Sequence, residues 1–84
     1  MSDRIELLGA AGRALHGRDW QRALAADLGP LHPDGPRSSI DDRLVRRWAA
    51  GDRAIPDWVG SALAELLTER QDVIAEAIAE LDRW

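Results

Sequence analysis

Three arginines fall close together in the stretch DRLVRRWAAGDR, at a spacing that a helix would place on one face. A helix advances about 100° per residue, so Arg43, Arg46 and Arg47 share a sector roughly 100° wide if residues 42–50 are helical. The opposite sector holds the apolar residues of the segment, Leu44, Val45 and Trp48. Guanidinium groups gathered in this way can neutralise phosphates, and each can donate two hydrogen bonds to a guanine. This arginine face, defined as Arg43, Arg46 and Arg47, is therefore predicted to contact DNA; the alternative is a solvated face on an ordinary amphipathic helix.

Other residue types that carry chemistry are too sparse to form a metal site or a catalytic centre. The two histidines, His16 and His32, lie far apart in the sequence with a single aspartate near each, whereas zinc needs three or four close ligands. Asp41 and Asp42 are adjacent, but helix capping accounts for the first, and no nucleophile or phosphate-binding loop accompanies them. The chain has no cysteine. We therefore expect no enzyme activity, no metal, no cofactor and no small-molecule ligand.

Charge is unevenly distributed along the 84 residues, whose formal net charge is -4. Residues 13–54 hold eight Arg and six Asp, whereas residues 55–84 hold two Arg and seven acidic residues. The middle of the chain is therefore mildly basic and its C-terminal third strongly acidic. Every basic residue is arginine, a bias that fits the GC-rich genome of a bacterium or its phage.

The length and the apolar runs predict one small domain over residues 1–84. No run of about 18 apolar residues occurs, so we expect no membrane partner. The N-terminal stretch MSDRIELLGAAG carries acids and lacks the apolar core of a secretory signal. A cytoplasmic location is therefore expected.

Helical periodicity runs through almost the whole chain, and strand-like alternation is nearly absent. A first helix is predicted to begin at Asp3, an N-cap with Glu6 at capping-box spacing, and to end at Gly17. A second helix is predicted over about 18–28, and a stiff loop rich in proline follows over 29–40.

The third and fourth helices have clear boundary signals. Asp41 is predicted to cap the third helix, and Gly51 to close it in the left-handed conformation. The fourth helix is predicted to start at Pro56 and to run to about Arg83. Its apolar stripe consists of Val59, Leu63, Leu66, Leu67, Ile74, Ala77, Ile78 and Leu81. Its other side carries an acidic stripe, defined as Glu65, Glu69, Asp72, Glu76 and Glu80.

Arg70 falls in the centre of the apolar stripe, where a charge is not expected. Three explanations are open: a helix break near Thr68, which has capping-box spacing to Gln71; an acidic partner; or an interface. Among the tryptophans, Trp48 and Trp20 are predicted to lie in the core. Trp58 falls on the acidic side of the fourth helix, where it would cap the core or meet a partner.

Residues 18–60 resemble the lambda-repressor/Cro-like helix-turn-helix family in two spaced patterns. The family's second helix often opens with Gln and continues with Leu-Ala and then Leu-Gly. The matching positions here are Gln21, Leu24, Ala25, Leu28 and Gly29. Its third helix reads as a cap, three residues, a β-branched residue, two polar residues, Trp, two residues and Gly. The matching positions here are Asp41, Val45, Arg46, Arg47, Trp48 and Gly51.

The chain also resembles small bacterial and phage members at Ile55-Pro56, where their fourth helix starts. It departs from the family in the turn, which usually has about four residues and here has twelve, Gly29 to Ile40. A longer turn could change the angle between the second and third helices. It could also add contacts, since His32 and Arg37 lie on it.

The resemblance implies roles for the polar residues at matching positions. Gln21 would hydrogen-bond a phosphate near the start of the second helix. Asp42, Arg43 and Arg46 would face base edges. Phosphate contacts would also come from Arg47 and Arg53.

We therefore expect an all-α helix-turn-helix domain of four to five helices, with the helix-turn-helix unit over 18–51 and a long C-terminal helix over 56–83. The expected function is a sequence-specific DNA-binding transcription regulator, a repressor or operon autorepressor of bacterial or phage origin. The alternative is a protein-binding inhibitor of a nucleic-acid enzyme, of anti-defence type, that uses the acidic C-terminal helix as a DNA mimic.

The expected partners are double-stranded DNA and a second copy of the chain. The apolar stripe continues well beyond Leu67, and no other segment except the first helix remains to cover it, so it would form a large exposed patch on a monomer. The predicted dimer interface consists of Val73, Ile74, Ala77, Ile78 and Leu81. A two-fold dimer would bind an inverted-repeat operator.

Overall fold

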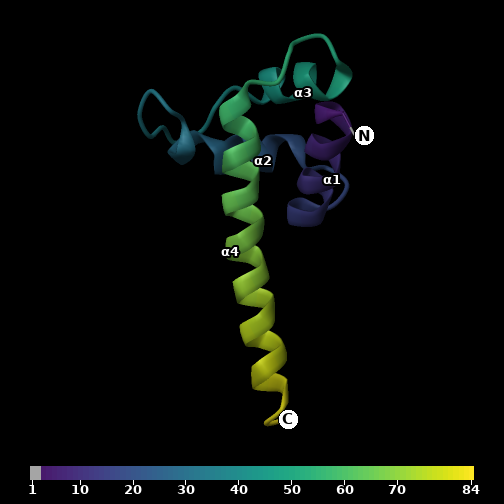
Figure 1. The fold of residues 1–84 in the computed structure, drawn as a ribbon, viewed down its shortest axis with the longest axis vertical. Coiled ribbons are helices and arrows are strands. Elements are labelled where there is room, and N and C mark those ends of the chain that lie inside the picture. The colour runs from purple at the N-terminus through teal and green to yellow at the C-terminus, as the bar shows by residue number, and fades with distance from the viewer. Residues whose placement is uncertain (1–2) are drawn as a thin grey trace.

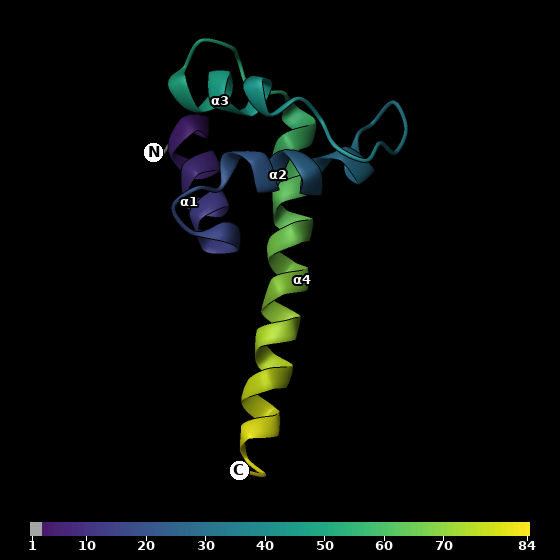
Figure 2. The same cartoon turned by 180° about the vertical axis from the view of Figure 1, so that it is seen from behind.

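The computed structural model describes residues 3–84, and every regular element in this part of the chain is helical. The elements are α1 (Arg4–His16), α2 (Gln21–Leu28), the 3-10 helix η1 (Gly29–Leu31), α3 (Asp42–Ala50) and α4 (Asp57–Leu81). The first three α-helices gather around the first half of α4, and its second half extends away from them (Figures 1 and 2). The resulting molecule measures 48 × 30 × 22 Å. The prediction of an all-α protein with a long C-terminal helix is confirmed.

Local chemistry fixes most of the helix ends where the sequence predicts them. The Asp3 side chain accepts a hydrogen bond from the Glu6 backbone N–H, and the Asp41 side chain accepts one from Arg43 N–H. Gly51 closes α3 with φ 83°, a left-handed conformation that a residue with a Cβ rarely adopts. These caps satisfy backbone groups that the helices themselves leave without partners.

The predicted start of the second helix is wrong, because α2 begins at Gln21 and not near Arg18. Trp20 stands just before α2 and is only 5% exposed. Its ring lies against Gly12 of α1, where no Cβ could be accommodated. Residues 17–20 are therefore used to turn the chain and to bring this ring into the core, and they do not join the helix.

The core lies where α1, α2 and α3 meet the first half of α4. Trp48 is 2% exposed and Trp20 is also buried, so the prediction that both belong to the core is confirmed. Trp58 is half-buried against the core, and its ring lies 5.1 Å from that of His32 in a tilted arrangement. The buried part of α4 ends at Leu63, with Leu66 and Leu67 half-buried beyond it.

The long turn between α2 and α3 folds back on itself. The carbonyl oxygen of Gly29 accepts hydrogen bonds from His32 N–H (3.2 Å) and from Arg37 N–H (3.0 Å). Ser39 passes so close to Gly29 that a Cβ there would meet its backbone. Residues 30–37 therefore form an excursion that leaves and returns at one point, and it projects on the side of α4 away from α1 (Figures 1 and 2).

The helix α4 runs unbroken through the position of Arg70. The Thr68 hydroxyl donates to the Ala64 carbonyl oxygen (2.8 Å), so it bonds within the helix and caps no second one. Arg70 Nη2 donates to the Leu15 carbonyl oxygen (3.1 Å) at the end of α1. A cation is favourable at this end of a helix, where carbonyl groups lack partners. This contact, which joins α1 to α4, differs from all three explanations that the sequence left open.

Candidate nucleic-acid interface

The helix α3, which carries the arginine face, lies at the opposite end of the molecule from the C-terminus (Figure 1). Val45 is fully buried and Trp48 nearly so, and together they hold the back of α3 against the core. The side chains of Arg43 and Arg46 are 84% and 60% exposed. Because the buried residues face the core, the guanidinium groups point outward into solvent.

Two carboxylates partly neutralise the positive charge of the arginine face. Arg46 Nε lies 3.4 Å from Asp42 Oδ2, and Arg43 Nε lies 3.8 Å from Asp41 Oδ1. Exposed pairs of this kind contribute only about 0.3–0.5 kcal/mol. Among residues 3–84, no carboxylate lies within ion-pair distance of Arg47. A polyanion could therefore displace the two weak pairs at little cost.

The other predicted DNA contacts are spread over three further segments. Gln21 is the first residue of α2 and is half-buried beside Ala49 of α3 and Arg13 of α1. Arg53 is exposed in the link that follows α3, and Arg37 is exposed at the returning end of the excursion. The remaining predicted contacts, Asp42, Arg43, Arg46 and Arg47, all lie on α3, and Gln21 lies next to that helix.

Two further arginines, which are not among the predicted DNA contacts, lie near the start of α2. Arg18 and Arg22 lie on either side of Gln21 in the sequence, and both are exposed. Both arginines are visible in the run GRDWQR, but with a helix start predicted near Arg18 their position beside the first turn of α2 could not be recognised. Both add positive charge near the end of α2 that bears unpaired N–H groups, where anions bind favourably.

The excursion does not hold α2 and α3 apart. Ile40 N–H donates to the Ala25 carbonyl oxygen (3.0 Å), which ties the residues before α3 directly to the last turn of α2. The two helices pack against each other, with Leu24 and Leu28 buried on one side and Val45 and Trp48 on the other. The number of residues in the turn therefore does not set the distance between α2 and α3.

One of the two histidines is paired with a carboxylate. His16 Nε2 lies 2.5 Å from Asp27 Oδ2, a pair that joins the end of α1 to α2. Asp19 is the acidic residue nearest to His16 in the sequence, but the fold brings this histidine to Asp27. Within residues 3–84, no group of three or more His, Cys, Asp or Glu side chains is placed to bind a metal. No helix in this part of the chain is long and apolar enough to cross a membrane.

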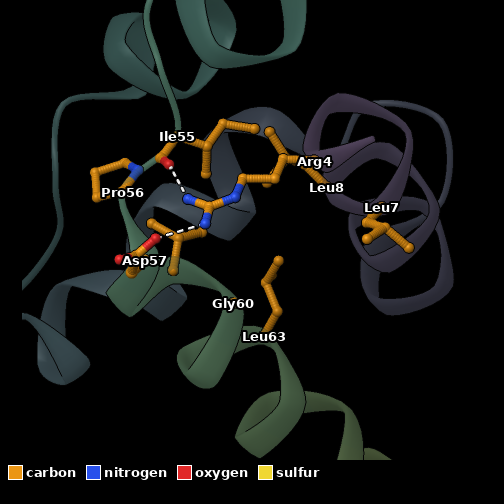
Figure 3. A pocket seen from close by; sticks show the side chains of 9 residues that line it. Arg4, Leu7, Leu8, Ile55, Pro56, Asp57, Gly60 and Leu63 are labelled. Carbon is orange, nitrogen blue, oxygen red and sulfur yellow. Dashed lines mark hydrogen bonds and ion pairs between the residues drawn. The ribbon is translucent and has the colours of Figure 1, made fainter. Parts of the chain in front are cut away.

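An open pocket of about 500 Å³ lies between α1 and the first turns of α4 (Figure 3). Its walls are mostly apolar and include Leu7, Gly60 and Leu63. At its upper end, Arg4 donates to the Ile55 carbonyl oxygen (2.7 Å) and to Asp57 Oδ1 (2.5 Å). Arg4 thereby joins the starts of α1 and α4, and most of the pocket surface is apolar.

The arrangement on α3 can bind a phosphate backbone through charge and can hydrogen-bond to base edges through its guanidinium groups. No family model, no curated protein and no solved structure matches the chain. The case for a function therefore rests on the geometry and chemistry of this face.

Proposed function

We propose that this protein is a sequence-specific DNA-binding regulator of the helix-turn-helix type, which acts by occupying an operator in double-stranded DNA. The observation that carries the proposal is the arginine face: three exposed guanidinium groups on one short helix, anchored from behind by the buried Val45 and Trp48. A helix of this kind fits the major groove, where arginine pairs with guanine O6 and N7.

The order of helices supports the resemblance to lambda-repressor/Cro-like proteins. Gln21 opens α2, Asp41 caps α3 and Gly51 closes it, as the resemblance implies. The long turn, which departs from the family pattern, is closed at its base by the bonds from Arg37 and Ile40. In this proposal α3 is the recognition helix, and the excursion is an additional loop beside the helix-turn-helix unit.

The roles proposed for individual residues follow from their places on α3 and around it. Arg43 and Arg46 read bases, with Asp42 beside them. Arg47 and Arg53 meet phosphates, and Gln21 meets a phosphate at the start of α2. Arg37 adds a contact from the excursion.

The acidity of the chain is compatible with DNA binding because the charges are separated in space. The second half of α4, which holds most of the acidic stripe, extends away from α3 (Figures 1 and 2). At physiological ionic strength, exposed charges further apart than about 8 Å are largely screened from each other. The carboxylates near the C-terminus therefore repel DNA at α3 only weakly.

We further propose that the regulator is a homodimer held by the exposed apolar residues at the end of α4. These are Val73, Ile74, Ala77, Ile78 and Leu81. A dimer presents two arginine faces and so doubles the phosphate contacts to about six. This predicts a slope near -5 for the logarithm of the binding constant against the logarithm of the salt concentration. The operator would be an inverted repeat with half-sites about one helical turn apart.

A second function is favoured by one separate observation. All members of the acidic stripe, from Glu65 to Glu80, are exposed along α4. A row of carboxylates on a free helix can occupy the basic groove of a nucleic-acid enzyme, so the protein could be an inhibitor that mimics DNA. The same binding experiment separates the two functions.

The test is a titration of labelled duplex DNA from the region upstream of the protein's own coding sequence, read by fluorescence anisotropy at low salt. We expect the parent to bind. Arg46→Ala should bind about 5- to 150-fold more weakly, since one base-reading arginine contributes about 1–3 kcal/mol. Arg83→Ala, which removes an exposed arginine at the far end of the molecule, is the matched control and should bind like the parent.

Two results would count against the regulator. Failure of the parent to bind this DNA at low salt would favour the inhibitor. Equal losses in Arg46→Ala and Arg83→Ala would mean that binding follows total charge and not the arginine face.

A further inference from the structure

A hollow of about 360 Å³ lies where α1, the start of α2 and the end of α3 meet. Each of the three helices contributes to its wall: Arg13 comes from α1, Gln21 from α2 and Ala49 from α3. We call it the three-helix hollow. It is separate from the apolar pocket between α1 and α4, and Gln21 is the only one of the predicted DNA contacts that lines it.

The Arg13 side chain lies over Gly9, one turn nearer the start of α1. Gly9 has no side chain and is nevertheless buried, and a Cβ added there would lie only 2.9 Å from Arg13 Nη1. Long side chains on a helix point back toward its N-terminus, and α1 begins beside α3 (Figures 1 and 2). The glycine therefore lets the guanidinium group of Arg13 lie close against α1, in the direction of α3.

The guanidinium group of Arg13 has no partner among residues 3–84. No carboxylate there lies within ion-pair distance of it, and none of its N–H groups takes part in a side-chain hydrogen bond. Arg4 and Arg70, by contrast, both donate to backbone carbonyl oxygens. The side-chain amide of Gln21 is also unpaired within these residues. The three-helix hollow therefore offers a positive charge and N–H donors from two helices to an anion.

The three-helix hollow borders the arginine face on the side of Arg46. At about 100° per residue, Asp42, Arg46 and Ala49 fall within a sector of α3 roughly 60° wide. Ala49, which lines the hollow, lies about 4.5 Å beyond Arg46 along the helix axis. A helix in the major groove lies between the two phosphate backbones that bound the groove. A duplex whose bases meet Arg46 would therefore bring backbone phosphates toward the hollow.

We propose that Arg13 and Gln21 together bind one backbone phosphate of DNA in the three-helix hollow. The inference rests on the proposed function, and it adds a contact from α1, a helix that lies outside the helix-turn-helix pattern. A guanidinium group can donate two parallel hydrogen bonds to a phosphate, and the charge on both partners makes these bonds strong. A phosphate contact carries no sequence information, but it fixes the register of the protein on the duplex. Arg13 would thus position the arginine face over its bases.

One carboxylate, that of Glu6, also lines the three-helix hollow. Glu6 is exposed and is not within ion-pair distance of Arg13. Its negative charge opposes a phosphate bound in the hollow, whereas the charge of Arg13 attracts one. Removing these two charges should therefore change DNA binding in opposite directions.

The test compares the dissociation constants of two duplexes at several salt concentrations, by fluorescence anisotropy. One duplex is selected by the parent protein from a random pool, and the other is an unrelated sequence of the same length. Arg13→Ala should weaken both by a similar factor and reduce the magnitude of the salt slope by about 1 for each bound chain. Arg46→Ala should weaken mainly the selected duplex. Arg83→Ala, at the far end of the molecule, is the control and should bind like the parent.

The same assay measures the opposite effect with Glu6→Gln, which should bind both duplexes more tightly than the parent. Glutamine forms helices as readily as glutamate and suits the same capping position, so the start of α1 should be preserved. The matched control is Glu76→Gln, an exposed residue of the acidic stripe on the second half of α4, which should bind like the parent. Because Arg13 is exposed and unpaired, Arg13→Ala should keep the melting temperature of the parent.

The outcomes separate this inference from the proposed function. If Arg13→Ala matches Arg83→Ala on both duplexes and in its salt slope, no phosphate binds at Arg13, and the regulator stands without this contact. A loss in Arg13→Ala that is confined to the selected duplex would also overturn the inference, because it would mean a base contact. Equal binding by Glu6→Gln and Glu76→Gln would exclude a phosphate from the hollow. If the parent itself binds neither duplex at low salt, the proposed function fails.

Discussion

The contact between Gly12 and Trp20 predicts that replacing Gly12 by alanine destabilises the protein, although the same replacement stabilises an ordinary helix. In an ordinary helix, Gly→Ala stabilises by about 0.8–1 kcal/mol. At Gly12 the new Cβ would overlap the Trp20 ring, which is buried and cannot swing into solvent. Overpacking of this kind destabilises by about 1–3 kcal/mol, and partial loss of the ring from the core would add to it.

We therefore expect Gly12→Ala to lower the free energy of unfolding by about 1–2 kcal/mol, out of the roughly 4–13 kcal/mol expected for a chain of this length. The matched control is Gly9→Ala in the same helix, where the new Cβ would meet only the mobile end of Arg13. It should be neutral or stabilising by up to about 1 kcal/mol. The assay is urea unfolding followed by circular dichroism, at one fixed protein concentration because dimerisation shifts apparent stability. If Gly12→Ala is as stable as Gly9→Ala, Trp20 does not pack against α1 as described.

Two further predictions concern the core and the end of α4. Trp48→Ala should destabilise by about 3–5 kcal/mol, because the side chain is 2% exposed at the centre of the core; an unchanged melting temperature would mean that the back of α3 is not buried. Truncation after Arg70 removes only exposed residues and keeps the Arg70 bond to Leu15, so the fragment should stay folded but sediment as a monomer at micromolar concentration. A fragment that remains dimeric would place the interface elsewhere.

The features that could be predicted from the sequence are those that depend on neighbouring residues. Asp3, Asp41 and Gly51 act on backbone groups within four residues of themselves, so their roles follow from local chemistry. The burial of Trp48 and the exposure of the arginine face follow from the helical period.

The features that could not be predicted join residues that are distant in the sequence. Arg4 reaches the Ile55 carbonyl, and Arg70 reaches the Leu15 carbonyl, and neither pairing has a local signal. The late start of α2 has the same cause, since Trp20 leaves the helical pattern to fill the space above Gly12.

The excursion between α2 and α3 illustrates the same limit. Its length alone predicts a changed angle between the second and third helices, because proline and glycine indicate where a chain turns but not where it returns. The bonds from Arg37 to Gly29 and from Ile40 to Ala25 close the excursion at its base. Only the folded backbone reveals this closure.

The central claim is that the arginine face of α3 reads DNA, and one measurement tests it most directly. A duplex is first selected by the parent protein from a random pool, and its dissociation constant is then compared for the parent and for the triple variant Arg43→Ala, Arg46→Ala, Arg47→Ala. Because all three side chains are exposed, the variant should keep its helix content and melting temperature. We expect selection of an inverted repeat and a loss of binding of at least about a hundredfold, since three arginines each contribute about 1–3 kcal/mol. A folded triple variant that binds the selected duplex as tightly as the parent would contradict this claim.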